Sequence, residues 1–288
     1  MKLGFIGQGW IGKNYANHFE ERGFKVVRYA KEAPYHANGT EINACDVVFI
    51  AVPTPTTPRG FDPSILKKVL PLVGKGKIAV IKSTIVPGTT RNLQKKFKDK
   101  TILYSPEFLR EAFARYDVDR PERTIVGLPT DTNRHRAAAK KVMEILPKAP
   151  YSRICSSEEA EMTKYAGNTF LYMKVVYMNM LYDLAKKLDA DWDVIAENVA
   201  ADSRVGKSHL RPVHASGHSE KAGRGAGGHC FVKDFAALKG LYKKIVRDRR
   251  GEEIFSAFEA KNNELLVKSG KDLDLLAHVY GGMVKIRR

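Results

Sequence analysis

A cysteine follows a glycine-rich run in the stretch GRGAGGHCFVKD, residues 223–234, and a lysine and an aspartate come shortly after it. A thiolate there could act as a nucleophile, because glycines let a substrate approach the backbone closely and Lys233 would favour the thiolate. Cys230 could also be a buried small side chain or a metal ligand. The four histidines of residues 209–229 have spacings that match no recognised zinc pattern, so we predict no metal site.

A second group of residues has the spacing of a phosphate-binding turn. Gly7, Gly9 and Gly12 form a Gly-x-Gly-x-x-Gly pattern directly after an apolar stretch. Glycine allows the tight turn, the close approach of a pyrophosphate and the packing of helix on strand, and the helix N-terminus offers free N–H groups. We therefore predict a dinucleotide site that includes Trp10 and Ile11 at the start of the helix.

The sequence leaves the identity of the dinucleotide open. NAD-binding domains of this type carry an acid at the end of the second strand, where this chain has VVRYAKE. Ala30 takes the place of the acid, and its neighbours Arg28 and Lys31 would suit the 2′-phosphate of NADP. A neighbouring backbone group could equally bind the ribose of NAD, so we expect NAD, with NADP as the alternative.

The elements that must position these residues begin with an alternating pattern. The first 150 residues alternate amphipathic stretches with short apolar ones that are rich in β-branched residues and bounded by glycine, proline or polar residues. Such alternation indicates parallel pairing in a doubly wound, Rossmann-type α/β sheet. The predicted strands are 2–6, 24–29, 46–52, 77–83, 101–105 and 123–128, with helical patterns at 12–23 and 62–74.

The pattern changes after residue 155. Ser156 and Glu159 have the spacing of a capping box, and a helical pattern then continues over 157–188. This helix is apolar on several sides, so other helices or a second subunit must cover it. Further helices are predicted at 191–201, 233–250 and 252–268, with a long loop at 202–230. The predicted domains are a dinucleotide-binding domain, 1–155, and an all-helical substrate and dimerisation domain with one long central helix, 156–288.

Composition narrows the class of protein. The 288 residues carry a formal net charge of +17, but basic residues alternate with acidic ones and no nucleic-acid module accompanies them. We therefore expect no nucleic-acid partner, and a phosphate-bearing small molecule would suit the positive field. The sequence has no signal peptide, no apolar run of membrane length and three widely spaced cysteines, so we predict a cytoplasmic protein without a membrane partner.

Six blocks of sequence together resemble the UDP-glucose/GDP-mannose 6-dehydrogenases. In order, they are CDVVFIAVPTP (45–55), KSTIVPGTT (82–90), SPEFLREAFA (105–114), DRPERTIVG (119–127), EAEMTKYAGNTFL (159–171) and GAGGHCFVKD (225–234). The resemblance implies an NAD(P)-dependent oxidoreductase of nucleotide sugar metabolism, which oxidises the C6 alcohol of a sugar nucleotide to a carboxylate in two hydride transfers. The second transfer requires a tetrahedral adduct, which a cysteine supplies as a thiohemiacetal that is then oxidised to a thioester.

The resemblance also implies catalytic roles. Cys230 matches the nucleophile, and Asp234 matches an acid that assists proton movement through a bound water. Lys164 and Asn168, one turn apart on the long helix, would position the sugar and stabilise negative charge on oxygen. Glu107 would activate water for hydrolysis of the thioester, supported by Glu111.

Binding roles follow from the same matches. Thr54, Thr84 and Lys233 would contribute to the cofactor site, and Gly227 to the substrate site. Arg204 matches an arginine that reaches the substrate of the neighbouring subunit, so we expect a homodimer formed through the long helix.

The chain departs from the family pattern in three ways. It ends before the third domain that grips the nucleotide in full-length members, so it could use a different substrate, work with a separately encoded partner, or be an inactive remnant. About ten extra residues precede Cys230, and this basic stretch could cover a phosphate or be a surface loop. His229 replaces a serine, Ala226 an aromatic residue and Ala112 a glycine; His229 could accept a proton from Cys230 or only fill space.

Two other functions remain open. A β-hydroxyacid dehydrogenase would share the cofactor fold, the helical second domain and a catalytic Lys-x-x-x-Asn such as Lys164 and Asn168. It transfers a single hydride and has no use for the thiol of Cys230. A non-catalytic nucleotide-binding remnant of a longer enzyme is the other alternative.

Overall fold

The computed structural model describes residues 1–282 and divides into two compact units. The first consists of Met1–Thr54 and Asp62–Lys164, and the second of Pro55–Phe61 and the chain from Tyr165 onward. This division differs from the expected boundary after residue 155 in two places. The start of the long helix packs with the first unit, and residues 55–61 contact helices of the second.

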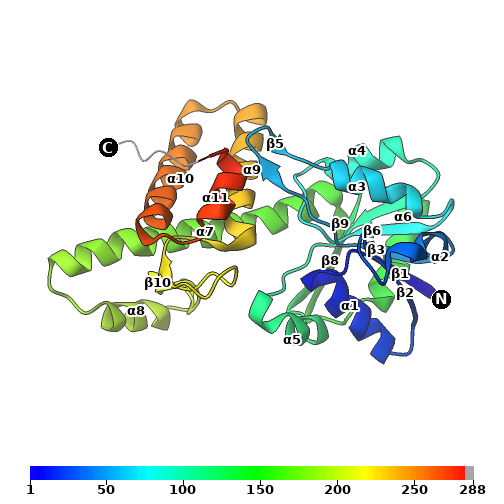
Figure 1. The fold of residues 1–288 in the computed structure, drawn as a ribbon, viewed down its shortest axis with the longest axis horizontal. Helices are drawn as coiled ribbons and strands as arrows, with labels where there is room; N and C mark the ends of the chain where they lie inside the picture. Colours follow the sequence, from blue (N-terminus) through cyan, green and yellow to red (C-terminus); the bar gives the residue numbers. More distant parts are fainter. Residues whose placement is uncertain (283–288) are drawn as a thin grey trace. The chain divides into compact units, whose positions relative to one another are not determined.

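The first unit is built on a seven-stranded sheet with the order β2-β1-β3-β6-β7-β8-β9 (Figure 1). The strands are β1 (Lys2–Ile6), β2 (Lys25–Tyr29), β3 (Val47–Ile50), β6 (Ile78–Ile81), β7 (Thr101–Tyr104), β8 (Arg123–Leu128) and β9 (Tyr151–Ser156). The predicted α/β class with a Rossmann-type sheet is confirmed. Strand β9 was not predicted, because its sequence YSRICS mixes polar and apolar residues, as an edge strand can.

One pair of strands contradicts the expected parallel pairing. Neighbouring strands run parallel except β7 and β8, which are antiparallel. The chain therefore enters β8 from the edge of the sheet at which β7 ends. As a result the connection of residues 105–122, which carries Glu107, stays at the carboxyl edge of β1, β3, β6 and β7, where ligands of open α/β sheets bind.

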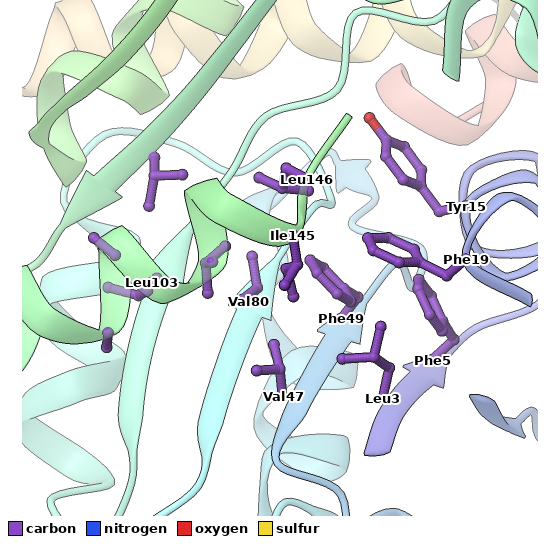
Figure 2. Packing of buried hydrophobic residues seen from close by; sticks show 14 of the residues in the cluster. Leu3, Phe5, Tyr15, Phe19, Val47, Phe49, Val80, Leu103, Ile145 and Leu146 are labelled. Carbon is purple, nitrogen blue, oxygen red and sulfur yellow. The ribbon is translucent and has the colours of Figure 1, made fainter. Parts of the chain in front are cut away.

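Helices cover the sheet of the first unit. They are α1 (Trp10–Glu21), α2 (Gly39–Asn43), α3 (Ser64–Val69), α4 (Thr89–Lys96), α5 (Ala114–Asp119) and α6 (Asn133–Ile145), with 3-10 turns at His36–Asn38, Leu70–Leu72 and Glu111–Phe113. Figure 2 shows the core between α1, α6 and the sheet. Phe49 of β3 stacks on Phe5 of β1 at 5.0 Å and on Phe19 of α1 at 5.4 Å between ring centroids. This contact fixes α1, and hence the turn that precedes it, against the strands.

The long helix α7 (Ser157–Lys187) has 31 residues and begins at the predicted capping box. The hydroxyl and backbone N–H of Ser156 donate to the Glu159 carboxylate at 2.8 and 2.7 Å, and the backbone N–H of Glu159 donates back to the hydroxyl at 3.3 Å. Because the first N–H groups of a helix lack intrahelical acceptors, this exchange defines where α7 starts.

Helices dominate the second unit, which also contains two small hairpins. Beyond α7 they are α8 (Trp192–Ala201), α9 (Gly228–Ile245), α10 (Arg249–Ser269) and α11 (Leu273–Tyr280), and the hairpins pair β4 (Thr56–Thr57) with β5 (Gly60–Phe61) and β10 (Val213–His214) with β11 (Gly223–Arg224). Tyr172 of α7 stacks on Phe235 of α9 with ring centroids 4.0 Å apart. No helix within residues 1–282 combines the length and apolar character needed to cross a bilayer.

The loop predicted over 202–230 is wrong at its end. Helix α9 begins at Gly228, five residues before the predicted start, so Cys230 lies in the first turn of a helix rather than in a loop. Gly228 has a φ of +82°, a conformation that glycine adopts without strain. The helix start was not predicted because a run of glycines, which are poor helix formers, precedes Cys230. Helix α11 was also not predicted.

A buried carboxylate joins α7 to α4. Glu161 accepts hydrogen bonds from the backbone N–H groups of Gly88 and Thr90, at 2.6 and 2.8 Å, and from the Thr90 hydroxyl at 2.6 Å. It therefore caps a helix whose own N-cap residue, Gly88, has no side chain. Burial raises the pKa of Glu161 to about 7, although the hydrogen bonds from Thr90 and Gly88 lower it.

We predict that Glu161→Ala lowers the free energy of unfolding by about 2–4 kcal/mol, because it leaves two buried donors of Thr90 and the partly buried N–H of Gly88 without their acceptor. Thr90→Val removes one of these bonds and should cost about 1 kcal/mol. The pKa of Glu161 is higher in the folded than in the unfolded protein. Its shift therefore adds to the free energy of unfolding below the unfolded pKa, and this contribution is lost as the pH rises through about 7. Urea unfolding of both variants measures these costs, and equal costs would contradict the capping role.

Candidate functional site

The glycine turn between β1 and α1 has the geometry that a dinucleotide requires. Gly7 has a φ of +93°, and a Cβ on it would lie 2.2 Å from the carbonyl oxygen of Ala51. A Cβ on Gly12 would lie 1.8 Å from the Gly7 carbonyl oxygen, whereas one on Gly9 would meet nothing within 4 Å. Gly7 and Gly12 therefore keep strand and helix in contact, while the space over Gly9 fits the pyrophosphate of a nucleotide.

The start of α1 supplies donors for phosphate. Gly9 is the N-cap residue of α1, and no side chain caps this end of the helix. The free N–H groups and the positive end of the helix dipole therefore favour an anion there. Trp10 and Ile11 occupy the first turn of the helix, with Trp10 exposed and Ile11 partly buried. Their contact with a cofactor stays a prediction.

The two predicted threonines meet at the same edge of the sheet. Thr54 follows β3 and Thr84 follows β6, and these neighbouring strands are parallel, so both segments leave the sheet beside each other. The Thr54 hydroxyl donates to the backbone carbonyl of Thr84 at 2.7 Å, and both side chains are buried. This bond ties together two segments that are both predicted to contribute to the cofactor site, and their contact with a cofactor stays a prediction.

Arg28, which was considered for the 2′-phosphate of NADP, is paired with Glu20 in the structure. Its guanidinium donates to both carboxylate oxygens of Glu20, at 3.1 and 2.6 Å, to the Asn17 side chain at 2.7 Å and to the Gln8 side chain at 3.3 Å. Lys31 is exposed. Binding of NADP through Arg28 would require breaking a bidentate ion pair, which favours NAD.

The predicted general base, Glu107, and the predicted charge-stabilising lysine, Lys164, lie in the first unit and contact each other. Glu107 follows β7, and its Oε1 lies 3.0 Å from Nζ of Lys164 on α7, with 6% of each side chain exposed. Its Oε2 accepts a hydrogen bond from the backbone N–H of Leu109 at 2.8 Å. The carboxylate is thus oriented by one charge and one backbone donor, as a general base must be.

Glu111 opens the 3-10 turn Glu111–Phe113 and is partly buried. None of the interactions described for residues 1–282 joins it to Glu107, so its supporting role stays a prediction.

The second unit holds four further predicted residues, and three of them, Asn168, Lys233 and Asp234, contact one another. Asp234, one turn after Cys230 on α9, accepts a hydrogen bond from the Asn168 amide of α7 at 2.6 Å. Lys233 lies 2.5 Å from the other oxygen of the same carboxylate, so its ammonium is held by Asp234. Cys230 is exposed in the first turn of α9, where the helix dipole stabilises a thiolate. The helix dipole is therefore one source of thiolate stabilisation, and the predicted effect of Lys233 on the thiol stays a prediction.

Buried polar side chains of α10 and the α10–α11 connection hold the glycine run in place. The Asn262 side chain exchanges two hydrogen bonds with the backbone of Ala226, at 2.7 and 3.0 Å, and Lys271 Nζ donates to the Gly225 carbonyl at 3.0 Å. The Asp272 carboxylate accepts from the backbone N–H of Gly228 at 2.8 Å, and a Cβ on Gly227 would lie 2.0 Å from this carboxylate. Gly227 is therefore required by packing, and its role in substrate binding stays a prediction.

The histidine next to the nucleophile belongs to a hydrogen-bonded chain. The rings of His229 and His218 are joined by a bond of 2.9 Å, and His218 bonds Asp274 of α11 at 2.8 Å. This chain anchors the extra segment before Cys230 to α9 and α11, so that segment is not a free loop throughout. Within residues 1–282 no three His, Cys, Asp or Glu side chains form a potential metal site.

Arg204 lies in the connection after α8, where its side chain is 88% exposed and is paired with Asp202 at 2.7 Å. An exposed arginine in this place could reach a neighbouring subunit, which stays a prediction.

The comparisons with known proteins decide the family. The NAD-binding domain of the UDP-glucose/GDP-mannose dehydrogenase family matches residues 35–146, and its central domain matches residues 158–264. The chain belongs to the UDP-glucose/GDP-mannose dehydrogenase family. The predicted family is thus confirmed, and NAD is the cofactor that its first domain implies.

Individual members of this family are longer than this chain. UDP-glucose 6-dehydrogenase TuaD of Bacillus subtilis is 33% identical over 84% of this chain and 59% of its own length. UDP-glucose 6-dehydrogenase AglM of Haloferax volcanii is 30% identical over 83% of this chain and 64% of its own. The solved UDP-glucose dehydrogenase of Pyrobaculum islandicum matches with a TM-score of 0.78 and 26% identity, over 98% of this chain and 71% of that one. The chain therefore spans about three fifths of these two curated relatives.

Sequence reasoning missed several residues of the site. Asn262, Lys271 and Asp272 lie far along the chain from the glycine run that they hold, and no local pattern connects them. Lys82 and Ser105, a buried pair joined by a hydrogen bond of 3.1 Å at the carboxyl ends of β6 and β7, were not singled out either. The lysine directly after the apolar stretch IAVI was a visible signal. A charge at the end of a central strand is costly unless it has a role.

Proposed function

We propose that this member of the family oxidises the C6 alcohol of a sugar nucleotide to the carboxylate by two hydride transfers through a covalent adduct on Cys230. The observation that supports this most is the position of Cys230 in the first turn of α9, one turn before an Asp234 that is bonded to Asn168. A reaction that stops after one hydride transfer would not need a thiol at a helix N-terminus.

The residues divide the work as follows. Lys164 and Asn168 stabilise the negative charge that develops on the C6 oxygen as the alcohol passes its proton to Asp234 through a water molecule. The glycine turn of Gly7, Gly9 and Gly12 would hold NAD, and two NAD molecules bound in turn would supply the hydride acceptor for the two oxidations. The Cys230 thiolate adds to the aldehyde carbon, the former carbonyl oxygen takes up a proton, and Asp234 assists this proton movement. Loss of this proton and of the second hydride leaves a thioester.

Hydrolysis completes the reaction. Glu107 accepts a proton from a water molecule as the water oxygen adds to the thioester carbon, and the tetrahedral adduct then expels the Cys230 thiolate. The Leu109 N–H and the Lys164 ammonium orient the carboxylate for this step.

A ligand panel followed by a stoichiometry measurement tests the proposal. Thermal shifts with NAD and with UDP-glucose, UDP-N-acetylmannosamine or GDP-mannose identify the substrate, because a ligand stabilises the fold that binds it. Two NADH per sugar consumed, with a carboxylate as product, supports the proposal. One NADH per substrate would favour a single-hydride dehydrogenase, and NAD binding without turnover on any sugar nucleotide would favour a non-catalytic remnant. Turnover by the chain alone would make a separate nucleotide-binding partner unnecessary.

We also propose that two copies associate through α7. An apolar stripe of exposed side chains follows this helix at intervals of seven, three, four and four residues, which places them on one face. Its members are Phe170, Tyr177, Met180, Leu184 and Leu188, the last directly after the helix. An exposed stripe of this length needs a partner surface, and a second copy supplies one with the same chemistry.

We predict that Leu184→Asp converts the dimer to a monomer, because the introduced charge would be buried in the interface. Sedimentation of the wild type and the variant measures this. Lys186→Asp, an exposed position on the opposite face of the same helix, is the control and should remain dimeric. A monomeric wild type would contradict the dimer.

A further inference from the structure

A lysine that no step of the proposed mechanism uses is buried beside the general base. Lys82 directly follows β6 and is 2% exposed. Its Nζ donates to the hydroxyl of Ser105 at 3.1 Å and lies 4.4 Å from the centroid of the Tyr15 ring. Since β6 and β7 are adjacent and parallel, Lys82 and Ser105 leave the sheet side by side, and Glu107 follows two residues later.

Keeping an ammonium group at this place is costly. Burial lowers the pKa of Lys82 to about 7, while the negative charge of Glu107 acts in the opposite direction. The ionisable groups around Lys82 are Tyr15 on α1, Glu107 after β7 and, beyond Glu107, Lys164 on α7. A methionine would fill the same volume without the desolvation cost, so packing alone does not explain the lysine.

The carboxylate of Glu107 is buried near two lysines, Lys164 and Lys82. Only 6% of its side chain is exposed, and a buried carboxylate without compensation would hold its proton and could not act as a base. Lys164 touches one oxygen, but in the proposed mechanism this ammonium also stabilises the substrate oxygen and cannot serve Glu107 alone. The contacts described for Lys82 within residues 1–282 are with a hydroxyl and the face of an aromatic ring, so this second cation supplies a field that is not shared with the substrate.

We propose that Lys82 is a positioning residue for hydrolysis: its ammonium stabilises the ionised carboxylate of Glu107 independently of Lys164, so that the base stays charged while Lys164 is engaged by the substrate. Lys82 touches neither substrate nor cofactor in this scheme and acts through Glu107. The inference rests on the proposed function for the role of Glu107, but the coupling of the two charges can be measured without any substrate.

The first arm of the test is a double-mutant cycle on stability with Lys82→Met and Glu107→Gln. At pH 6, where Lys82 is charged, we expect the two substitutions to be non-additive, with a coupling of tenfold or more in the unfolding equilibrium constant. The coupling should shrink as the pH rises through about 7 and Lys82 loses its proton. Additive effects at every pH would overturn the proposal, whether or not the protein turns over a sugar nucleotide.

The second arm measures activity and separates positioning from support of the fold. Lys82→Met should keep or raise the melting temperature at pH 6, because it removes a buried charge, yet slow the hydrolytic step about tenfold or more and move the acid limb of its pH–rate profile to higher pH. Lys100→Met is the matched control, since Lys100 is also buried but pairs with Asp99. Unchanged hydrolysis in Lys82→Met would overturn the proposal. A wild type without any turnover would overturn the proposed function instead.

Discussion

Replacing Cys230 by serine is expected to abolish formation of the carboxylate and to lower overall turnover by about 10³-fold or more. A serine hydroxyl in the first turn of α9 would remain protonated, because its pKa lies far above that of a thiol and the helix dipole cannot supply the difference. Without the adduct the second hydride has no tetrahedral carbon to leave from. NADH formation and product analysis with the substrate found in the ligand panel measure the effect.

The chain provides matched controls for this substitution. Cys45 is fully buried and Cys155 partly buried, and neither lies in the second unit. Cys155→Ser should therefore retain activity close to that of the wild type. Carboxylate formation by Cys230→Ser at the wild-type rate would disprove the covalent mechanism, whereas release of aldehyde with one NADH per sugar would support the assignment of Cys230 to the second oxidation.

Replacing Glu107 by glutamine is expected to leave both oxidations intact and to slow hydrolysis by about 10²–10⁴-fold, the usual contribution of a general base. Glutamine keeps the size of the side chain and can accept the hydrogen bond from Leu109, but it cannot take a proton from water. The enzyme should therefore release a burst of two NADH per active site and then stop. Mass spectrometry of the quenched protein should find the acyl group on Cys230.

Glu111→Gln is the informative comparison, because Glu111 lies in the same connection between β7 and β8 but is only partly buried. A rate close to that of the wild type would remove Glu111 from the mechanism, and a partial burst would support the predicted assistance to Glu107. Full turnover by Glu107→Gln would show that another group activates the water.

Much of the fold and of the site chemistry could be predicted from local sequence. The six apolar stretches predicted in the first 150 residues are strands in the structure. Short runs of β-branched residues flanked by turn residues are typical of strands in a parallel sheet that helices cover. The capping box at Ser156 and Glu159 fixed the start of α7 for the same local reason. Gly7 and Gly12 could be assigned because no other residue fits the contact between strand and helix.

Tertiary structure decided what depends on segments far apart in the chain. The reversal between β7 and β8 keeps Glu107 at the carboxyl edge of the sheet, and nothing in SPEFLREAF specifies that direction. The start of α9 could not be predicted from its glycine-rich sequence. Asn262 and Asp272, from another part of the chain, accept hydrogen bonds from the backbone N–H groups of Ala226 and Gly228 there.

The sequence by itself determined which groups could do chemistry in this protein, because the nucleophile, the acids and the phosphate turn are chemical types at local spacings. Only the folded chain decided their electrostatic surroundings. Lys82 and Glu107 are 25 positions apart along the chain, and Glu107 and its ion-pair partner Lys164 are 57 positions apart. Folding brings these charges near each other, and the energy of a charged group depends on its burial and on the charges that lie near it in space.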